Sequence, residues 1–207
     1  MRLHLLHALF TKEQGRCLGV YNKKVPPEIG TLTHCRWRAR LSEQLGTYYL
    51  EEGFPLSIGY LEDKKRLACI SSLCHLLDDF LPERQVFQNL YEQTLSFFEQ
   101  LESSQFLKYY ILWERDLLAE IGFGLELTEC AAGGDSQNLK YVSPRTGRAV
   151  SEEKGIPYRS KLLLLPAFLW KESEASEEDI RMGLKLTGYF LRQHSLKNRL
   201  PQVRTQL

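Results

Sequence analysis

The chain has 207 residues and a mass of 24.1 kDa, and with 43% hydrophobic and 26% charged residues it has the composition of a globular protein with a substantial core. A formal net charge of +1 and an isoelectric point near 7.6 exclude a uniformly basic nucleic-acid binder. Five cysteines without paired spacing argue against a disulfide framework and indicate a reducing compartment.

Residues 1 to about 55 have the short apolar segments and turn residues of an all-β region. Apolar residues at 3–10 predict a first strand, which is interrupted by histidines and is too short for a signal peptide or a membrane span. A turn built on Gly15 leads to a second predicted strand at 17–21. Such short, closely spaced strands favour a small barrel or a curled sheet.

The stretch from His34 to Glu52 combines a strand pattern with a chemical one, and Thr31 opens the strand. Alternate side chains of a strand share a face, so an apolar face alternates with a cationic face. The apolar face carries Cys35, Trp37, Ala39 and Leu41, and the other carries His34, Arg36, Arg38 and Arg40. Side chains on one face repeat at roughly 6.6 Å, which is close to the phosphate spacing of an extended nucleic-acid strand.

A turn at 45–47 and a returning strand at 48–52 would complete a hairpin with the arginine-bearing strand. Two interpretations fit this hairpin from the pattern alone. One is a nucleic-acid-binding face, and the other is a half-buried strand whose arginines are simply solvated.

From Pro55 onward the apolar residues take helical spacing. The spacing predicts helices over 67–81, 90–101 and 106–121. For the third of these helices, Ser104 is the predicted N-cap and Gly122 the predicted stop.

Residues 127–158, which we call the excursion, lose the helical pattern and carry several glycines and prolines. Helices are predicted again over 162–170 and 180–194, the second with Ser176 and an acidic first turn at its start. The change of period places a domain boundary near residue 55.

The sequence offers no pattern of catalytic or metal-binding residues. Its paired acidic residues are adjacent and point apart, and it has no nucleophile elbow, P-loop or dinucleotide fingerprint. The histidines lack metal-ligand spacing, and Cys130 stands alone with Gly133 three residues on. We expect the protein not to be an enzyme.

Several stretches, in order along the chain, match one family. They are LFTKEQGRCLGV at 9–20, RWRARLSEQLGTYYLE at 36–51, LLDDFLPER at 76–84, LLAEIGFGLELTECAAGGDSQNLKYVSPRTGRAVSEEKGIPY at 117–158, LPAFL at 165–169 and LKLTGYFLRQH at 184–194. With these motifs the chain resembles the bacterial RecO DNA repair proteins, in particular their alphaproteobacterial branch.

The resemblance implies an α+β protein with two domains. Residues 1–55 would form an OB-fold-like β-barrel that binds DNA, and residues 56–207 an all-helical domain with a degenerate zinc-finger-like excursion at about 127–158. Met1 aligns inside the family's second barrel stretch, so the first OB strand is expected to be missing. Either the barrel has an open edge, or the start codon is assigned too late.

In zinc-binding relatives the excursion carries two pairs of cysteines. Here Cys130 remains, and the other positions correspond to Gly133, Ser151 and Lys154. One thiol cannot hold structural zinc, so we expect no cofactor and no metal. Packing and hydrogen bonds would hold the excursion instead.

The resemblance further implies a mediator of homologous recombination. Such a protein binds single- and double-stranded DNA, promotes strand annealing and assists RecA loading with RecR, and it also binds the C-terminal tail of the single-stranded-DNA-binding protein SSB. We expect it in the cytoplasm, associated with the nucleoid and not with a membrane. The alternative is a protein-interaction scaffold with a degenerate OB fold that binds SSB or RecR but not DNA.

We expect DNA contacts from basic residues of the barrel and of the C-terminal region, where every charged side chain from 181 to 207 is basic. The expected contact residues are Arg16, Lys23, Lys24, Arg36, Arg38, Arg40, Lys197 and Arg199. An ordinary solvated tail is the alternative for the last two. Trp37, Tyr48 and Tyr49 could stack on bases, although Trp37 lies on the apolar face and fits a core position.

Overall fold

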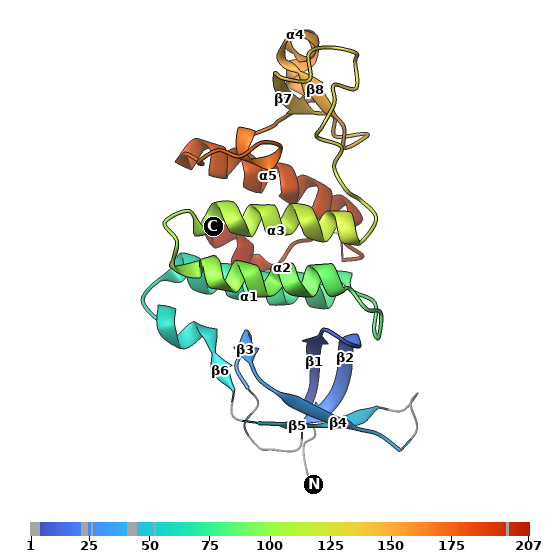
Figure 1. Ribbon diagram of the computed structural model, residues 1–207, viewed down its shortest axis with the longest axis vertical. Helices are drawn as coiled ribbons and strands as arrows, with labels where there is room; N and C mark the ends of the chain where they lie inside the picture. The colour runs from blue at the N-terminus through green and yellow to red at the C-terminus, as the bar shows by residue number, and fades with distance from the viewer. Residues whose placement is uncertain (1–4, 22–24, 26, 41–44, 52, 198) are drawn as a thin grey trace. The chain divides into compact units, whose positions relative to one another are not determined.

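The computed structural model describes residues 5–21, 25, 27–40, 45–51, 53–197 and 199–207. Figure 1 shows an N-terminal β region followed by a mostly helical region. The first part contains β1 (Leu5–Thr11), β2 (Gly15–Tyr21), β3 (Thr31–Leu32), β4 (Cys35–Arg38), β5 (Gly46–Leu50) and β6 (Phe54–Pro55). The second contains η1 (Leu56–Tyr60), α1 (Lys64–Phe80), α2 (Gln88–Glu99), η2 (Gln100–Glu102), α3 (Phe106–Glu120), β7 (Leu139–Val142), β8 (Ala149–Ser151), α4 (Glu152–Gly155), η3 (Ile156–Lys161), β9 (Leu163–Leu164), η4 (Ala167–Leu169), α5 (Glu177–His194) and η5 (Gln202–Gln206).

The chain divides into two compact units. The first unit comprises residues 1–91 together with 201–207, and the second comprises residues 92–200. The change from strands to helices falls at residues 55–56, close to the domain boundary predicted from the sequence. That boundary stays a prediction, because the compact units divide after Tyr91 instead.

In the first unit, four strands form a sheet in the order β1-β2-β5-β4. β1 and β2 are an antiparallel hairpin whose turn needs the positive φ of Gly15 (+68°), as the sequence predicted. β2 runs parallel to β5, and β4 returns antiparallel to β5. Figure 1 shows β4 and β5 crossing below the β1–β2 hairpin, so the sheet is curled. Among the described residues no ladder joins its edge strands β1 and β4, so the structure shows a curled sheet without closure into a barrel.

The buried face of this sheet depends on two glycines. Tyr48 is only 1% exposed, and its ring packs against Gly19. A Cβ on Gly19 would lie 2.5 Å from the nearest carbon of this ring. The Tyr48 hydroxyl donates a hydrogen bond of 2.7 Å to the Cys17 carbonyl. Similarly, Trp37 lies against the backbone of Gly46. A side chain at either glycine would displace an aromatic ring from the core.

The arginine-bearing strand differs from the prediction in two respects. It is interrupted after Leu32, so that β3 pairs with β6 while β4 pairs with β5. Gly46 and Thr47 were predicted to form a turn but belong to β5. The antiparallel return itself is confirmed.

Three predicted helices are confirmed as α1, as α2 with η2, and as α3. Gly122 follows α3 with a φ of +88°, the left-handed conformation in which helices commonly end. Ser104 as the N-cap of α3 was wrong. Gln105 takes that position, and Ser103 Oγ accepts a hydrogen bond from the Gln105 N–H at 3.1 Å.

In the second unit, α3 and α5 share a core that contains a buried polar pair. The Thr187 hydroxyl on α5 donates a 2.5 Å hydrogen bond to Glu114 Oε2 on α3, and neither side chain is exposed. Gly183 lets α5 approach Ile111 of α3 closely. The helix α5 begins as predicted, with Ser176 and Asp179 forming a capping box.

The excursion contains β7 and β8, which join β9 in a three-stranded antiparallel sheet in the order β8-β7-β9. The region after residue 56 is therefore not entirely helical. The helix predicted over 162–170 was wrong, because this segment forms β9, extended backbone at Pro166 and then η4. Its apolar run lacks helical periodicity, and Pro166 has no N–H to donate within a helix.

Candidate nucleic-acid interface

The ladder between β4 and β5 determines which side chains share the solvent-facing side. Arg36 lies opposite Tyr49, and Arg38 lies opposite Thr47. The next pair in this register brings His34 opposite Glu51, whose N–H donates to the His34 carbonyl at 3.0 Å. We call these six residues, His34, Arg36, Arg38, Thr47, Tyr49 and Glu51, the arginine face.

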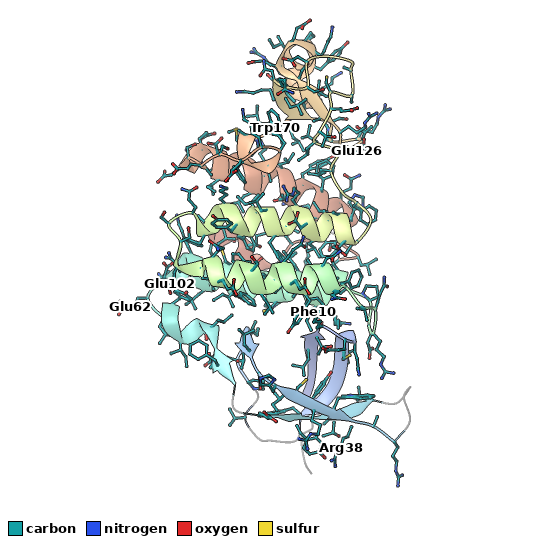
Figure 2. The ribbon with its side chains drawn as sticks, in the orientation of Figure 1. Phe10, Arg38, Glu62, Glu102, Glu126 and Trp170 are labelled. Carbon is teal, nitrogen blue, oxygen red and sulfur yellow. The ribbon has the colours of Figure 1, made fainter. Side chains whose placement is uncertain are left out.

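The cationic and aromatic groups of the arginine face are accessible and close together. The guanidinium carbon of Arg38 lies 5.8 Å from the centroid of the Tyr49 ring, and Tyr49 is 44% exposed. Figure 2 shows Arg38 on the outer side of the β4–β5 pair. Within the described part of the chain no ion pair neutralises Arg36 or Arg38. The only carboxylate on the face is Glu51, at its end.

The opposite side of the same strands faces the core at Trp37 and Tyr48, whereas Cys35 on that side is exposed. Tyr48 is buried, so it cannot stack on a base, and its predicted candidacy for stacking was wrong. Burial also raises the pKa of its hydroxyl above the ordinary value. Trp37 is half-buried on this side, as the alternation predicted, which leaves Tyr49 as the accessible aromatic residue of the hairpin.

Arg16 is held by a partner from α1. Its Nε donates to Asp78 Oδ1 at 2.8 Å, and a second guanidinium nitrogen lies 2.8 Å from the same oxygen. The Arg16 side chain is only 16% exposed. Its charge is therefore compensated within the protein, and we do not include it in the arginine face.

The other predicted contact residues are spread over the chain. Lys23 and Lys24 lie outside the described residues. Arg40 is exposed just after β4. Lys197 and Arg199 are exposed, but they belong to the second unit and not to the unit that carries the arginine face. Their contact with DNA stays a prediction.

Sequence reasoning missed one cation near the hairpin. The guanidinium carbon of Arg84 lies 5.4 Å from the centroid of the Trp37 ring, on the core side of β4. No local pattern could have found it, because Arg84 lies in the loop between α1 and α2 and approaches β4 only through the tertiary fold.

Cys130 in the excursion is enclosed by hydrogen-bond donors. Its Sγ accepts from the Ser151 N–H at 3.2 Å and lies 3.5 Å from Ser151 Oγ. Burial opposes ionisation, but these bonds and those from the N–H groups of Ala132 and Gly134 outweigh it and lower the pKa of the thiol to about 7.

The residues around Cys130 do not fit a zinc ion. A Cβ on Gly134 would lie 2.2 Å from Ser151 Oγ and 2.8 Å from Lys154 Cγ, so these side chains fill the space beside the sulfur. A structural zinc ion needs four sulfur, imidazole or carboxylate ligands. In the described ranges no three His, Cys, Asp or Glu side chains are grouped to hold a metal.

Comparison with known proteins identifies the family. Residues 61–203 match the family described as the C-terminal region of recombination protein O. The DNA repair protein RecO of Rhodospirillum centenum is 44% identical, with 97% of this chain and 85% of the relative covered. The chain belongs to the RecO family of DNA repair proteins. RecO of Jannaschia sp. (40% identical, 96% and 85% covered) and RecO of Anaplasma marginale (36%, 94% and 85%) are also similar.

Membership of the RecO family confirms the resemblance seen in the sequence motifs and agrees with a recombination protein rather than an enzyme. The RecO C-terminal match begins at residue 61 and so includes α1 to α5 and the excursion. It leaves the arginine face outside, in the N-terminal β region. Among the residues that the structure describes, no helix is long and apolar enough to cross a bilayer.

Proposed function

We propose that this RecO protein binds single- and double-stranded DNA through the arginine face, in an N-terminal region with the character of an OB fold. The observation that carries the proposal is the exposed group of Arg36, Arg38 and Tyr49 on one side of β4–β5. Alternate residues of a strand are about 6.6 Å apart, so Arg36 and Arg38 can follow a phosphate backbone, and the exposed ring of Tyr49 can stack on a base.

The proposed role is that of a recombination mediator in the cytoplasm, at the nucleoid. Bound strands would be annealed to their complements, and RecA would be loaded at gaps together with RecR. The C-terminal tail of SSB is a further proposed partner. Family membership supports this role, and the uncompensated charge of the arginine face gives it a physical basis.

The experiment is a fluorescence anisotropy titration of a labelled single-stranded oligonucleotide at several salt concentrations. We expect tight binding that weakens steeply with salt, because phosphate contacts release counterions. Arg36→Ala and Arg38→Ala should each weaken binding to all sequences and reduce the salt slope by roughly 0.7 to 1.

Two control variants make this test specific. Lys65→Ala removes an exposed charge of the same sign from α1 in the same unit and should leave affinity unchanged. Glu51→Gln removes the carboxylate of the arginine face and should strengthen binding. If the arginine variants bound as tightly as the wild type, or no more weakly than Lys65→Ala, the arginine face would be a solvated surface.

A second candidate function is a protein-interaction scaffold that binds SSB or RecR but not DNA. Exposed apolar side chains favour it, since Leu32 and Phe54 face each other across β3–β6 and are 38% and 62% exposed. Ile58 and Leu61 on the following segment are also exposed. Exposed apolar groups of this kind often mark protein interfaces. Absence of oligonucleotide binding, together with retained binding of RecR or of an SSB-tail peptide, would favour the scaffold.

A further inference from the structure

The loop between α1 and α2, residues 82–87, is bound to the start of β2. The Arg84 N–H donates a 2.7 Å hydrogen bond to the Arg16 carbonyl, and Glu83 and Arg16 form a parallel bridge. At Gly15 a Cβ would lie 1.7 Å from the Gln85 carbonyl oxygen, so only glycine permits this approach. The main chain of the loop is thereby fixed to β2.

Arg84 itself has an unusual backbone. Its φ is +61°, and it is the one non-glycine residue with positive φ among the residues that the structure describes. This conformation is unfavourable for a residue with a Cβ, so the surrounding contacts must impose it. The surrounding structure therefore determines the main-chain conformation from which the Arg84 side chain extends, and the Nε of that side chain also lies 3.6 Å from Glu83 Oε1.

The Arg84 side chain reaches a different strand from the one that holds its main chain. Its guanidinium carbon lies 5.4 Å from the centre of the Trp37 ring on β4. In the sheet order β1-β2-β5-β4, strands β2 and β4 are separated by β5. Arg84 therefore connects two strands that have no ladder between them.

Trp37 is a residue of β4, so the contact of Arg84 with its ring acts on that strand. Its ring lies against the backbone of Gly46 on β5, and its buried Nε1 has no hydrogen-bond partner among the described residues. The indole is therefore placed by packing and by the cation of Arg84 and not by a hydrogen bond of its own. β4 is an edge strand, paired in the described part of the sheet with β5 alone, so a contact on its core side adds to the constraints on its orientation.

We propose that Arg84 is a positioning residue for nucleic-acid binding. By holding Trp37 on the core side of β4, it fixes the orientation of Arg36 and Arg38 on the other side of the same strand. It acts through Trp37 without touching the bound strand. This inference rests on the proposed DNA binding by the arginine face.

The first test is the same anisotropy titration with Arg84→Gly and Arg84→Lys. Glycine adopts positive φ without strain, so Arg84→Gly should keep the melting temperature while it weakens oligonucleotide binding by about two- to tenfold. The salt slope should stay that of the wild type, because no phosphate contact is lost. Arg84→Lys should recover part of the affinity, since an ammonium group can also lie over the ring.

Two outcomes of this titration would overturn the inference. Unchanged affinity in Arg84→Gly would show that the contact does not position β4. A salt slope lowered by about one would show that Arg84 contacts a phosphate directly.

The second test removes the other half of the contact. Trp37→Leu should weaken binding to a similar degree, and the double variant Arg84→Gly/Trp37→Leu should lose no more than either single variant. Fully additive losses would mean that the two residues act independently. If Arg84→Gly is poorly folded, Arg84→Lys replaces it in the cycle with Trp37→Leu.

The variants also separate this inference from the proposed function. If Arg36→Ala and Arg38→Ala weaken binding and Arg84→Gly does not, the arginine face stands and Arg84 has no positioning role. If the two arginine-face variants leave binding intact, the proposed function fails and this inference fails with it.

Discussion

Tyr48 and Tyr49 are adjacent in sequence and have opposite environments. Tyr48 is buried over Gly19 and donates to a carbonyl of β2, whereas Tyr49 is 44% exposed and lies under Arg38. The alternation of a strand separates them. At this scale, one tyrosine stabilises the sheet and the other is available to a ligand.

For Tyr49 we predict a loss of oligonucleotide affinity on Tyr49→Ala, since stacking of one base on an aromatic ring contributes about 1–3 kcal/mol. The salt slope should not change, because no charge is removed. Tyr49→Phe is the matched control, since it keeps the ring and should bind like the wild type. Anisotropy titrations at several salt concentrations measure both quantities. Equal binding by the alanine and phenylalanine variants would show that Tyr49 does not stack.

Residue alternation is the part of the site that the sequence could predict. It placed Arg36 and Arg38 on the face opposite Trp37, and the ladder confirms this arrangement. It could not predict that Arg16 pairs with Asp78, because the two residues are 62 positions apart and meet only through the tertiary fold. Nor could it predict the position of Arg84, because the Arg84 side chain reaches β4 from a loop between helices and only through the tertiary fold.

At the scale of elements, periodic segments were predicted well and aperiodic ones were not. α1, α3 and α5 have clear helical spacing, and Ser176 begins α5 through a capping box. The segment at 162–170 is uniformly apolar, so its pattern did not distinguish a strand from a helix. Pro166 decides against a helix there.

The excursion owes part of its stability to Cys130, and this contribution should depend on pH. The thiol has its pKa lowered from 9.0 to about 7 in the folded state. Hydrogen bonds to the thiolate therefore stabilise the fold fully above pH 9, and this stabilisation is lost as the pH falls through 7. Cys130→Ser keeps a hydroxyl at the position but does not ionise in this range.

We expect the free energy of unfolding of the wild type, relative to Cys130→Ser, to rise by about 1–3 kcal/mol between roughly pH 6 and 9. Urea unfolding followed by the fluorescence of Trp113 and Trp170 would measure it, because both tryptophans belong to the same unit as the excursion. A difference between wild type and variant that stays constant with pH would show that the thiol remains protonated.

At the scale of the whole molecule, stability should not depend on a metal. The space beside Cys130 is filled by Ser151 and Lys154, and the sulfur is satisfied by hydrogen-bond donors. Dialysis against a strong chelator should therefore leave the melting curve of the full chain unchanged. Protein dialysed against the same buffer without chelator is the control. A large fall in melting temperature, reversed by added zinc, would contradict the arrangement described for the excursion.

The N-terminal unit is built from two separated parts of the chain. Residues 201–207, which include η5, pack with α1 in the unit that holds the sheet and the arginine face. On a ribosome, this unit cannot be completed when its first 91 residues have been made, because the whole second unit is synthesised before residue 201. The second unit can therefore fold first, although it comes later in the chain. During that interval α1 lacks the contact with η5 that it has in the finished unit, so newly made chains leave part of the N-terminal unit accessible to chaperones.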